Sequence, residues 1–479
     1  MFRWQKVLLG VVLMVVFWLV YSPHFGYPYP FHIDEWHQIT EALKLGDGQP
    51  PAGFYGAELG FHLVLFGLSG IFNLVLIYQY LPAVWAVVSA LVLFYLVRRK
   101  TGEYFIALLA VIFFASIKSD VNITGLWFFT PLSFAIPFIY LYFYLFDEGI
   151  KTQNKKFLLW SLGTMLFLVF THAISVLFAL PALLVFLIIN FKSIREKRKI
   201  FLLFSLVPIS GLVFFKYFSG YNWLLAVRSL SSSLLFKPGF GVVESFNYPT
   251  EFYSLVGYFF ALIGIVFIIA SRDRLKRYLL FILWPVSILL SFLVFYIFGI
   301  SFLSPFQRNL YYFALSLPLL SAVGFYFVVK LIISAVSVYC RKDYRMPVIF
   351  IVIFIFSVTS LIAVFRSYYT VSPRFSLYRS IDDDDYRVLR IMSKLPKAKI
   401  MATPAVSEAV YPVSGNDVVG TLFFYGDRTK SERFFASSSC LVKNKILGEE
   451  NVDYVLSRGK IACGWEQLYN YNNFVYRVK

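Results

Sequence analysis

Long apolar runs dominate the pattern of hydrophobic and polar positions over most of the chain. Many approach about 18 residues, the length that a helix needs to cross the roughly 30 Å hydrocarbon core of a bilayer. We therefore expect a mainly α-helical, polytopic transmembrane bundle of about eleven spans. The expected spans lie near residues 7–21, 76–97, 104–117, 130–146, 158–171, 173–190, 200–218, 252–270, 278–300, 310–331 and 347–365.

The composition supports a membrane protein. Hydrophobic residues make up 59% of the chain and charged residues only 15%, which leaves too little polar surface to cover a soluble domain of this length. Aromatic residues, 20% of the total, gather at the ends of many runs, as is typical of the membrane interface. The first apolar run ends at Tyr21–His24 without a small-x-small cleavage site, so we interpret it as a retained span and not as a signal peptide.

The distribution of basic residues predicts the orientation. With the N-terminus in the cytoplasm, about 20 Lys and Arg residues fall in cytoplasmic segments and only about 6 in the opposite loops, the long C-terminal tail being left out of the count. This bias places the first polar loop and residues 366–479 together on the extracytoplasmic side. The net charge of +18 is thus explained by short basic clusters between spans, and nucleic-acid binding is not expected because no basic face forms.

Two domains are predicted. Residues 1–365 hold the spans and a long first outer loop (22–75), and residues 366–479 form a small extracytoplasmic α/β domain. In the loop, the apolar spacing of residues 34–44 predicts a short amphipathic helix. Residues 59–72 predict a helix that lies in the interface or crosses halfway.

The tail has its own pattern of elements. The aspartates at 382–385 precede an apolar helical pattern and indicate a helix start, with a metal site as the weaker alternative. Residues 399–402, 452–456 and 474–478 predict strands. Cys440 and Cys463 both lie in this domain, where a disulfide is chemically permitted; the sequence leaves their pairing open.

The first outer loop concentrates ionisable residues near the membrane, where they are costly unless they have a function or a partner. The pair Asp34-Glu35 stands just beyond the first span. A carboxylate there can serve as a general base, or it can bind a divalent cation with His37 or His32. The alternative is that Asp34 only caps the helix that follows.

Further polar residues on the predicted outer side are candidates for substrate binding. Arg308 is the only basic residue of its turn, and its guanidinium suits a lipid-linked phosphate because it can bind two oxygens at once. Snorkelling or a structural ion pair is the alternative. His172, in a short turn between spans, can bind substrate or stabilise the turn. Lys118, which can also pair with a neighbouring aspartate, and Glu58 complete the set.

This layout resembles the GT-C superfamily of integral membrane glycosyltransferases. The likeness rests on one span followed by Asp34-Glu35 in a long outer loop, the segment Phe61-His62-Leu63-Val64-Leu65, and a C-terminal external domain. The segment Pro305–Tyr312 is similar to the arginine-bearing segment of such proteins. Within the superfamily, the chain resembles prokaryotic relatives of protein O-mannosyltransferases and of aminoarabinose and Rgt-type transferases.

The resemblance implies a transferase in the cell envelope whose donor is a polyprenyl- or dolichyl-phosphate-linked sugar, and our hypothesis for the reaction is inverting displacement at the anomeric carbon. It implies Asp34 as base or metal ligand with Glu35 beside it, Arg308 at the lipid phosphate and His172 near the substrate. The acceptor is then a glycan, a lipid or a protein. Whether a divalent metal ion (Mg, Mn or Zn) takes part is left open, because Asp34 can act as base or as metal ligand. The tail has no counterpart of the WWDYG signature of oligosaccharyltransferases, which argues against transfer of a whole oligosaccharide.

Two other classes of function fit a polytopic chain. A transporter or flippase for lipid-linked sugars would also need many spans, but transporters usually carry midplane ionisable residues and internal repeats. The expected spans here are almost free of acidic residues, and no repeat is visible. A non-catalytic assembly protein for envelope glycans is the other alternative, and the presence of Asp34-Glu35 and Arg308 counts against it.

Overall fold

The computed structural model describes most of the chain as two compact units. The described residues are 3–49, 58–119, 125–191, 204, 235–236, 249–339, 345–366, 368, 379–422 and 425–478. The first unit comprises Met1–Pro23, Tyr55–Phe61 and Pro82–Val371, and the second comprises His24–Phe54, His62–Leu81 and Ser372–Lys479. The second unit therefore combines segments of the first outer loop with the C-terminal tail.

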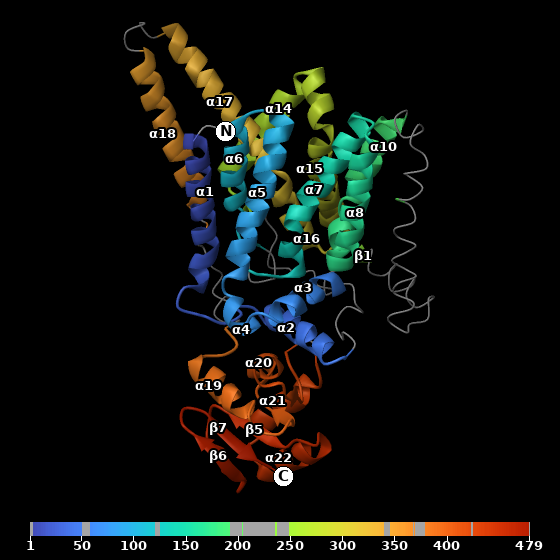
Figure 1. Ribbon diagram of the computed structural model, residues 1–479, viewed down its shortest axis with the longest axis vertical. Helices are drawn as coiled ribbons and strands as arrows, with labels where there is room; N and C mark the ends of the chain where they lie inside the picture. Colours follow the sequence, from blue (N-terminus) through green and yellow to red (C-terminus); the bar gives the residue numbers. More distant parts are fainter. Residues whose placement is uncertain are drawn as a thin grey trace. The chain divides into compact units, whose positions relative to one another are not determined.

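The first unit is built from helices (Figure 1). They are α1 (Arg3–Tyr21), α5 (Leu81–Thr101), α6 (Tyr104–Ala115), α7 (Pro131–Lys151), α8 (Lys155–His172), α9 (Ile174–Leu177), α10 (Leu180–Ile189), α14 (Leu255–Ile269), α15 (Arg272–Phe298), α16 (Phe306–Ser316), α17 (Pro318–Tyr339) and α18 (Arg345–Phe365). The two-residue strands β1 (Leu235–Phe236) and β2 (Ser301–Phe302) pair antiparallel. Every apolar run expected to span falls on a helix or a pair of helices, except 200–218, of which the structure describes only residue 204.

Five helices in the described part of the chain are long and apolar enough to cross a membrane. They are Arg3–His24, Leu81–Thr101, Arg272–Phe298, Phe306–Val338 and Met346–Phe365. Shorter apolar helices include Tyr104–Ala115 and Leu255–Ile269. The molecule is thus a membrane protein with a mainly helical fold, and the full set of eleven spans stays a prediction.

Proline explains where the helices depart from the apolar runs. The run expected at 76–97 divides, because α4 (Leu74–Ile77) is separate and α5 begins with Leu81 and Pro82. Likewise, α17 begins at Pro318, directly after α16. Proline has no backbone N–H, and it is tolerated in the first turn of a helix, where no such donor is needed. Apolarity alone does not show these divisions.

Two glycines allow α14 and α17 to touch backbone to backbone. A Cβ atom added to Gly264 would lie 2.1 Å from the carbonyl oxygen of Leu320, and one added to Gly324 would lie 1.9 Å from that of Phe260. Small residues at helix crossings are the usual means of close packing in membranes. This crossing therefore depends on the absence of two side chains.

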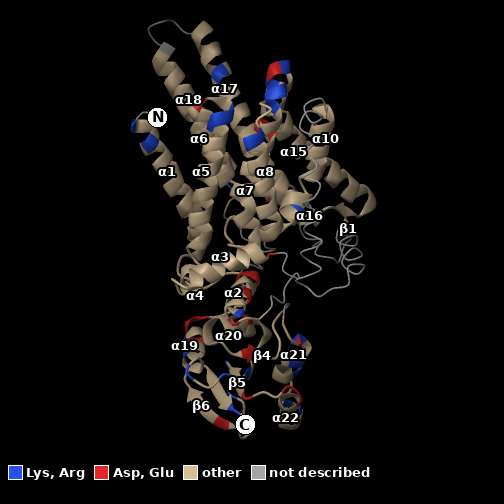
Figure 2. Cartoon of the chain, turned by 45° about the vertical axis from the view of Figure 1, so that its right-hand side comes forward, with Lys and Arg blue, Asp and Glu red and all other residues tan. Residues whose placement is uncertain are grey.

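Charge gathers at the ends of the helices of the first unit. Basic residues begin α1 and α15 and end α5, and Figure 2 shows the charged ends of α1 and α15 at the same end of this unit. At the end of α5, Lys100 forms ion pairs with Asp147 and Glu148 of α7, and Lys151 also binds Asp147 at 2.6 Å. The buried Asp147 carboxylate is thus neutralised by two lysines.

The second unit contains the first-loop helices and a mixed sheet (Figure 1). Its helices are α2 (Ile33–Gly46), α4, α19 (Asp383–Met392), α20 (Pro404–Ser414), α21 (Arg428–Ala436) and α22 (Cys440–Glu449); α3 (Leu59–Ser69) runs from one unit into the other. The strands are β3 (Lys399–Met401), β4 (Asp417–Val418), β5 (Tyr454–Ser457), β6 (Glu466–Asn470) and β7 (Phe474–Arg477). They lie in the order β4-β3-β5-β7-β6, with β3 parallel to β4 and β5, and β7 antiparallel to β5 and β6. The tail therefore contains the helices and the small sheet that the sequence predicts, and a separate domain at residues 366–479 stays a prediction.

Local sequence signals explain several of these elements. Asp382 caps α19 by accepting the N–H of Asp385, and the Asp385 side chain accepts the N–H of Asp382 in return. Asp385 also pairs with Arg458 of the tail. The acidic run is therefore a helix start, as its sequence favoured. A core that includes Met401, Val455 and Phe434 fills the space between the sheet and its helices.

Candidate functional site

The N-terminus of α2 carries the two acidic residues singled out from the sequence. His32 caps this helix, and its Nδ1 accepts the backbone N–H of Asp34 at 3.1 Å. Glu35 completes a capping box, because its Oε2 accepts the N–H groups of Phe31 at 2.7 Å and His32 at 3.0 Å. Capping therefore belongs to His32 and Glu35, and the alternative that Asp34 caps the helix is wrong. A catalytic role for Glu35 stays a prediction.

Asp34 is placed differently from its buried neighbour. Its side chain is 16% exposed, whereas Glu35 is fully buried. Asp34 Oδ1 lies 3.8 Å from Nδ1 of His32; because that nitrogen accepts a backbone N–H, the contact is not a hydrogen bond. The first turn of a helix also favours a negative charge. Asp34 thus presents a partly accessible carboxylate at a favourable position.

Histidine side chains lie further along α2. His62 of α3 donates from Nε2 to the side-chain oxygen of Gln38. The ring of His37 is buried, 5.5 Å from the ring of Tyr425 in the tail. Burial, together with the nearby His62 and Lys44, lowers the pKa of His37 from 6.5 to about 3. His37 is therefore neutral at physiological pH, the form in which histidine binds metals.

The tail adds a carboxyl group that sequence reasoning missed. Helix α20 packs against α2 (Figure 1) and carries the buried Glu408, whose Oε1 accepts the N–H of Leu422 at 2.8 Å. Burial first, and then the charge of Asp34, raise the pKa of Glu408 from 4.5 to about 8, although hydrogen bonds from Leu422 and Thr421 oppose the rise. No motif marks Glu408, because its environment arises from packing between segments far apart in sequence.

In the first unit, the two candidates Arg308 and His172 lie together. Arg308 is the third residue of α16, and its Nη1 lies 3.1 Å from Nε2 of His172. The other ring nitrogen of His172 lies 2.6 Å from Oγ of Ser175, which is 3.1 Å from the hydroxyl of Tyr312. The Tyr312 ring stacks on Phe178 at 3.8 Å. These residues form one polar chain, buried except for the partly exposed Arg308, with an aromatic support.

The hydrogen-bonding capacities in this chain specify its protons. A guanidinium can only donate, so Nε2 of His172 must accept from Arg308 and carry no proton. The proton of the neutral ring then lies on Nδ1 and is donated to Ser175. The neutral His172 ring therefore orients Arg308 without neutralising its positive charge. The remaining N–H donors of the guanidinium can bind an anion.

A second set of hydrogen bonds fixes the turn that presents Arg308. The side-chain amide nitrogen of Asn309 donates to Ser291 of α15 at 3.1 Å and to Ser301 at 3.1 Å. Ser304 in turn donates to the amide oxygen of Asn309. All four of these polar groups lie at the junction between α15 and α16. The backbone around Arg308 is thus held on both sides.

The other candidates have local surroundings of their own. Lys118 donates from Nζ to the carbonyl of Thr250 at 3.2 Å, and burial lowers its pKa while the nearby Glu251 opposes this. Glu58 directly precedes α3, where its carbonyl accepts the N–H of Phe61. Asp120, the alternative partner of Lys118, lies outside the described residues. Asp34 and His37 belong to the second unit, and Arg308, His172, Lys118 and Glu58 to the first.

Helical spacing could have revealed part of the missed network. Tyr312 stands four residues after Arg308 on α16, and Ser175 stands three residues after His172. Residues three or four apart lie on one face of a helix. Tyr312 was therefore visible as a neighbour of Arg308, whereas Ser175, which belongs to α9 and not to α8, and the contact of α8 with α16 were not.

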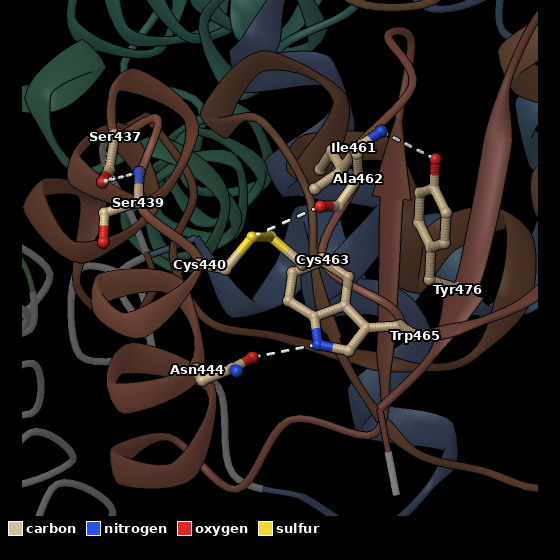
Figure 3. Close-up of a disulfide and its surroundings, with 9 residues drawn as sticks. All are labelled: Ser437, Ser439, Cys440, Asn444, Ile461, Ala462, Cys463, Trp465 and Tyr476. Carbon is tan, nitrogen blue, oxygen red and sulfur yellow. Dashed lines mark hydrogen bonds between the residues drawn. A yellow bond between two sulfur atoms is a disulfide. The ribbon is translucent and has the colours of Figure 1, made fainter.

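The cysteine pairing left open by the sequence is settled by the structure. Cys440, at the start of α22, and Cys463, just before β6, form a disulfide with Cα atoms 5.4 Å apart. Beside it, Nε1 of Trp465 donates to the side-chain oxygen of Asn444 at 2.9 Å, as Figure 3 shows. The bridge closes a loop with a sequence separation of 23, which stabilises a domain mainly by restricting its unfolded chain.

Metal binding can be judged from the donor residues. Among the described residues, no group of three or more His, Cys, Asp or Glu side chains is placed to hold a metal ion. Asp34 and His37, three positions apart on α2, supply two of the expected donors. A carboxylate suits Mg²⁺ or Mn²⁺, whereas an imidazole suits Zn²⁺ and other transition metals, so a metal site at Asp34 and His37, and the choice among Mg, Mn and Zn, stay predictions.

Comparison with known proteins shows which solved structures share this fold. No protein-family model and no curated protein sequence matches the chain. Among solved structures, the oligosaccharyltransferase of Archaeoglobus fulgidus, tethered to an acceptor peptide, aligns with a TM-score of 0.58 at 13% identity over 95% of this chain and 69% of its own. The same archaeal enzyme, AglB, in complex with an inhibitory peptide and a dolichol-phosphate aligns with a TM-score of 0.56 at 12% identity over the same shares of the two chains.

A third solved structure matches over nearly its full length. ArnT of Cupriavidus metallidurans aligns with a TM-score of 0.51 at 12% identity over 98% of this chain and 97% of its own. Identities this low establish the architecture and not the individual functional residues. The chain thus shares the fold of AglB and ArnT, as its resemblance to the GT-C superfamily predicts.

Proposed function

We propose that the protein is a membrane glycosyltransferase that moves a sugar from a polyprenyl- or dolichyl-phosphate carrier to an acceptor on the extracytoplasmic face. The observation that carries this proposal is the fold shared with AglB and ArnT over 95% or more of the chain. The solved complex of AglB with a dolichol-phosphate supports a lipid-linked donor. The acceptor belongs to a glycan, a lipid or a protein.

Asp34 is the proposed general base. It removes the proton of the acceptor hydroxyl as that oxygen bonds to the anomeric carbon. The bond between the anomeric carbon and the phosphate oxygen breaks at the same time, and the phosphate leaves with the electron pair. Attack opposite the leaving group inverts the anomeric configuration. The partly exposed carboxylate of Asp34 suits this role better than the buried, capping carboxylate of Glu35.

Arg308 is the proposed ligand of the leaving phosphate. Its guanidinium would balance the charge that develops on the phosphate oxygens during departure. Support comes from the contact with His172, which orients the group, and from the Asn309 hydrogen bonds, which fix its turn. A guanidinium that is already oriented loses little conformational freedom when the phosphate binds.

We further propose that Asp34 and His37 are the protein ligands of a divalent cation. Such an ion would neutralise charge at the donor phosphate. The low pKa of His37 keeps its ring available as a ligand at neutral pH. We expect chelation to abolish transfer, and the addition of Mg²⁺, Mn²⁺ or Zn²⁺ in turn to show which ion restores it, because a carboxylate with an imidazole can bind each of them.

The test is a transfer assay with a synthetic polyprenyl-phosphate sugar and the purified full chain. Asp34→Asn should lower kcat by about 10²–10⁴-fold, the usual contribution of general-base catalysis. Arg308→Ala should weaken binding of the lipid phosphate by roughly tenfold or more, because it removes a charged hydrogen-bonding group.

Matched controls change exposed residues of the same type. Asp273→Asn and Arg272→Ala alter the exposed start of α15, and we expect both to retain wild-type transfer. Turnover of Asp34→Asn at the wild-type rate, or unchanged phosphate affinity in Arg308→Ala, would contradict the proposed roles.

A further inference from the structure

A polar pocket lies within the second unit, where helix α2 meets the tail. Its free volume, part of which is open to solvent, is about 330 Å³. The residues that define its chemistry are Thr40, Lys44, Ser407, Glu408, Asp417 and Tyr425. Neither the sequence motifs nor the proposed mechanism uses this pocket, and most of its polar groups come from the tail.

The charges around the pocket balance. The Nζ atom of Lys44 stands over the rings of Tyr425 at 4.2 Å and Tyr411 at 5.0 Å, so cation–π contacts hold the ammonium in place. The carboxylate of Asp417 provides one opposite charge at an exposed position. Glu408 is buried, and its raised pKa keeps it mostly protonated at neutral pH. The pocket therefore has no excess of positive charge with which to bind a phosphate or a nucleotide.

The hydrogen-bonding groups suit a ligand that both donates and accepts. The hydroxyl of Thr40 donates to the carbonyl of Trp36 at 3.0 Å, and that of Ser407 donates to the carbonyl of Ala402 at 3.3 Å. Their lone pairs remain as acceptors, as do those of Asp417. A protonated Glu408 and the ammonium of Lys44 supply donors. A sugar hydroxyl can satisfy both kinds of group at once.

We propose that this pocket binds one neutral pyranose residue of a saccharide. The polar lining disfavours a lipid tail, and the balanced charge disfavours an anion. The inference rests on the pocket alone and is independent of the role of Asp34 in transfer.

The test measures saccharide binding directly. Saturation-transfer difference NMR on the purified full chain, at pH 7, uses the methyl glycosides of glucose, galactose, mannose and N-acetylglucosamine. We expect a saturable signal from at least one of them. Thr40→Val and Asp417→Ala should each weaken its binding about fivefold or more, because each removes a neutral or charged hydrogen bond. Asp417 is exposed, so this variant should fold.

Two further variants separate this inference from the proposed function. Glu432→Gln changes an exposed residue of α21 that pairs with Arg428, and binding should equal that of the wild type. Asp34→Asn should lose transfer and keep glycoside binding. The inference is overturned if no glycoside gives a saturable signal, if both pocket variants bind like the wild type, or if a Ser/Thr-containing peptide binds and no glycoside does. None of these results bears on catalysis by Asp34.

Discussion

At the scale of single residues, Glu408 and His37 make the folding stability of the second unit depend on pH in opposite ways. The pKa of Glu408 is raised to about 8, so between pH 4.5 and 8 the folded protein binds this proton more tightly than the unfolded chain. The stability contributed by Glu408 therefore falls as pH rises through that window. The pKa of His37 is lowered to about 3, so its contribution is lost as pH falls below 6.5.

We predict that Glu408→Gln stabilises the protein at alkaline pH. Glutamine cannot ionise, and it keeps an oxygen that can accept the N–H of Leu422. The difference in unfolding free energy from wild type should be near zero at pH 5 and reach roughly 1–4 kcal/mol above pH 8. Thermal unfolding of both proteins from pH 5 to pH 9 measures this difference. The contribution of His37 is the same in both proteins and therefore cancels. A difference that does not change with pH would contradict the assigned environment of Glu408.

At the scale of secondary structure, the crossing of α14 and α17 requires glycine at 264 and 324. We predict that Gly324→Leu prevents stable folding, because its Cβ would lie 1.9 Å from the carbonyl oxygen of Phe260, and a backbone atom cannot move away as a side chain can. The yield of monodisperse protein in detergent and its unfolding temperature should both fall sharply. Gly163→Leu is the control, since no atom lies within 4 Å of a Cβ placed there. Equal yields from the two variants would contradict the crossing.

Local elements were predictable from the sequence where a short-range signal exists. The spacing of Trp36, Ile39 and Leu43 predicted α2, and the aspartates before Val388 predicted α19. In both cases the apolar residues at helical spacing and the residues typical of a helix start lie within a few positions of one another. The boundaries at Pro82 and Pro318 were missed because hydrophobicity was counted without regard to the missing N–H of proline.

Contacts between distant segments were not predictable in the same way. Tyr425 donates its hydroxyl to Glu41, and Tyr411 donates to Asp47 at 2.7 Å, so the tail binds one face of α2. These partners are separated by more than 360 positions, and nothing local relates them. Arg308 and His172 were both identified from the sequence, but their contact depends on how α8 and α16 pack. The sequence thus predicted candidate groups, and the fold decided which of them meet.

At the scale of the whole molecule, the orientation in the membrane is still a prediction from charge. Basic residues concentrate in segments assigned to the cytoplasm, such as the start of α15, whereas the tail is assigned to the other side. The disulfide between Cys440 and Cys463 is an independent reason for this assignment, because such bonds persist in oxidising compartments. Charge bias and cysteine chemistry therefore agree on the location of the tail.

We predict that a membrane-impermeant maleimide separates the two faces. In a Cys340→Ser background, Glu449→Cys on the exposed face of α22 should react in intact cells, and Arg272→Cys at the exposed start of α15 only after permeabilisation. The background itself should stay unlabelled, because its remaining cysteines are joined. Labelling of Arg272→Cys in intact cells, or protection of Glu449→Cys, would reverse the orientation. Asp34 would then face the cytoplasm together with the tail, since a single crossing, α1, separates the N-terminus from the first loop.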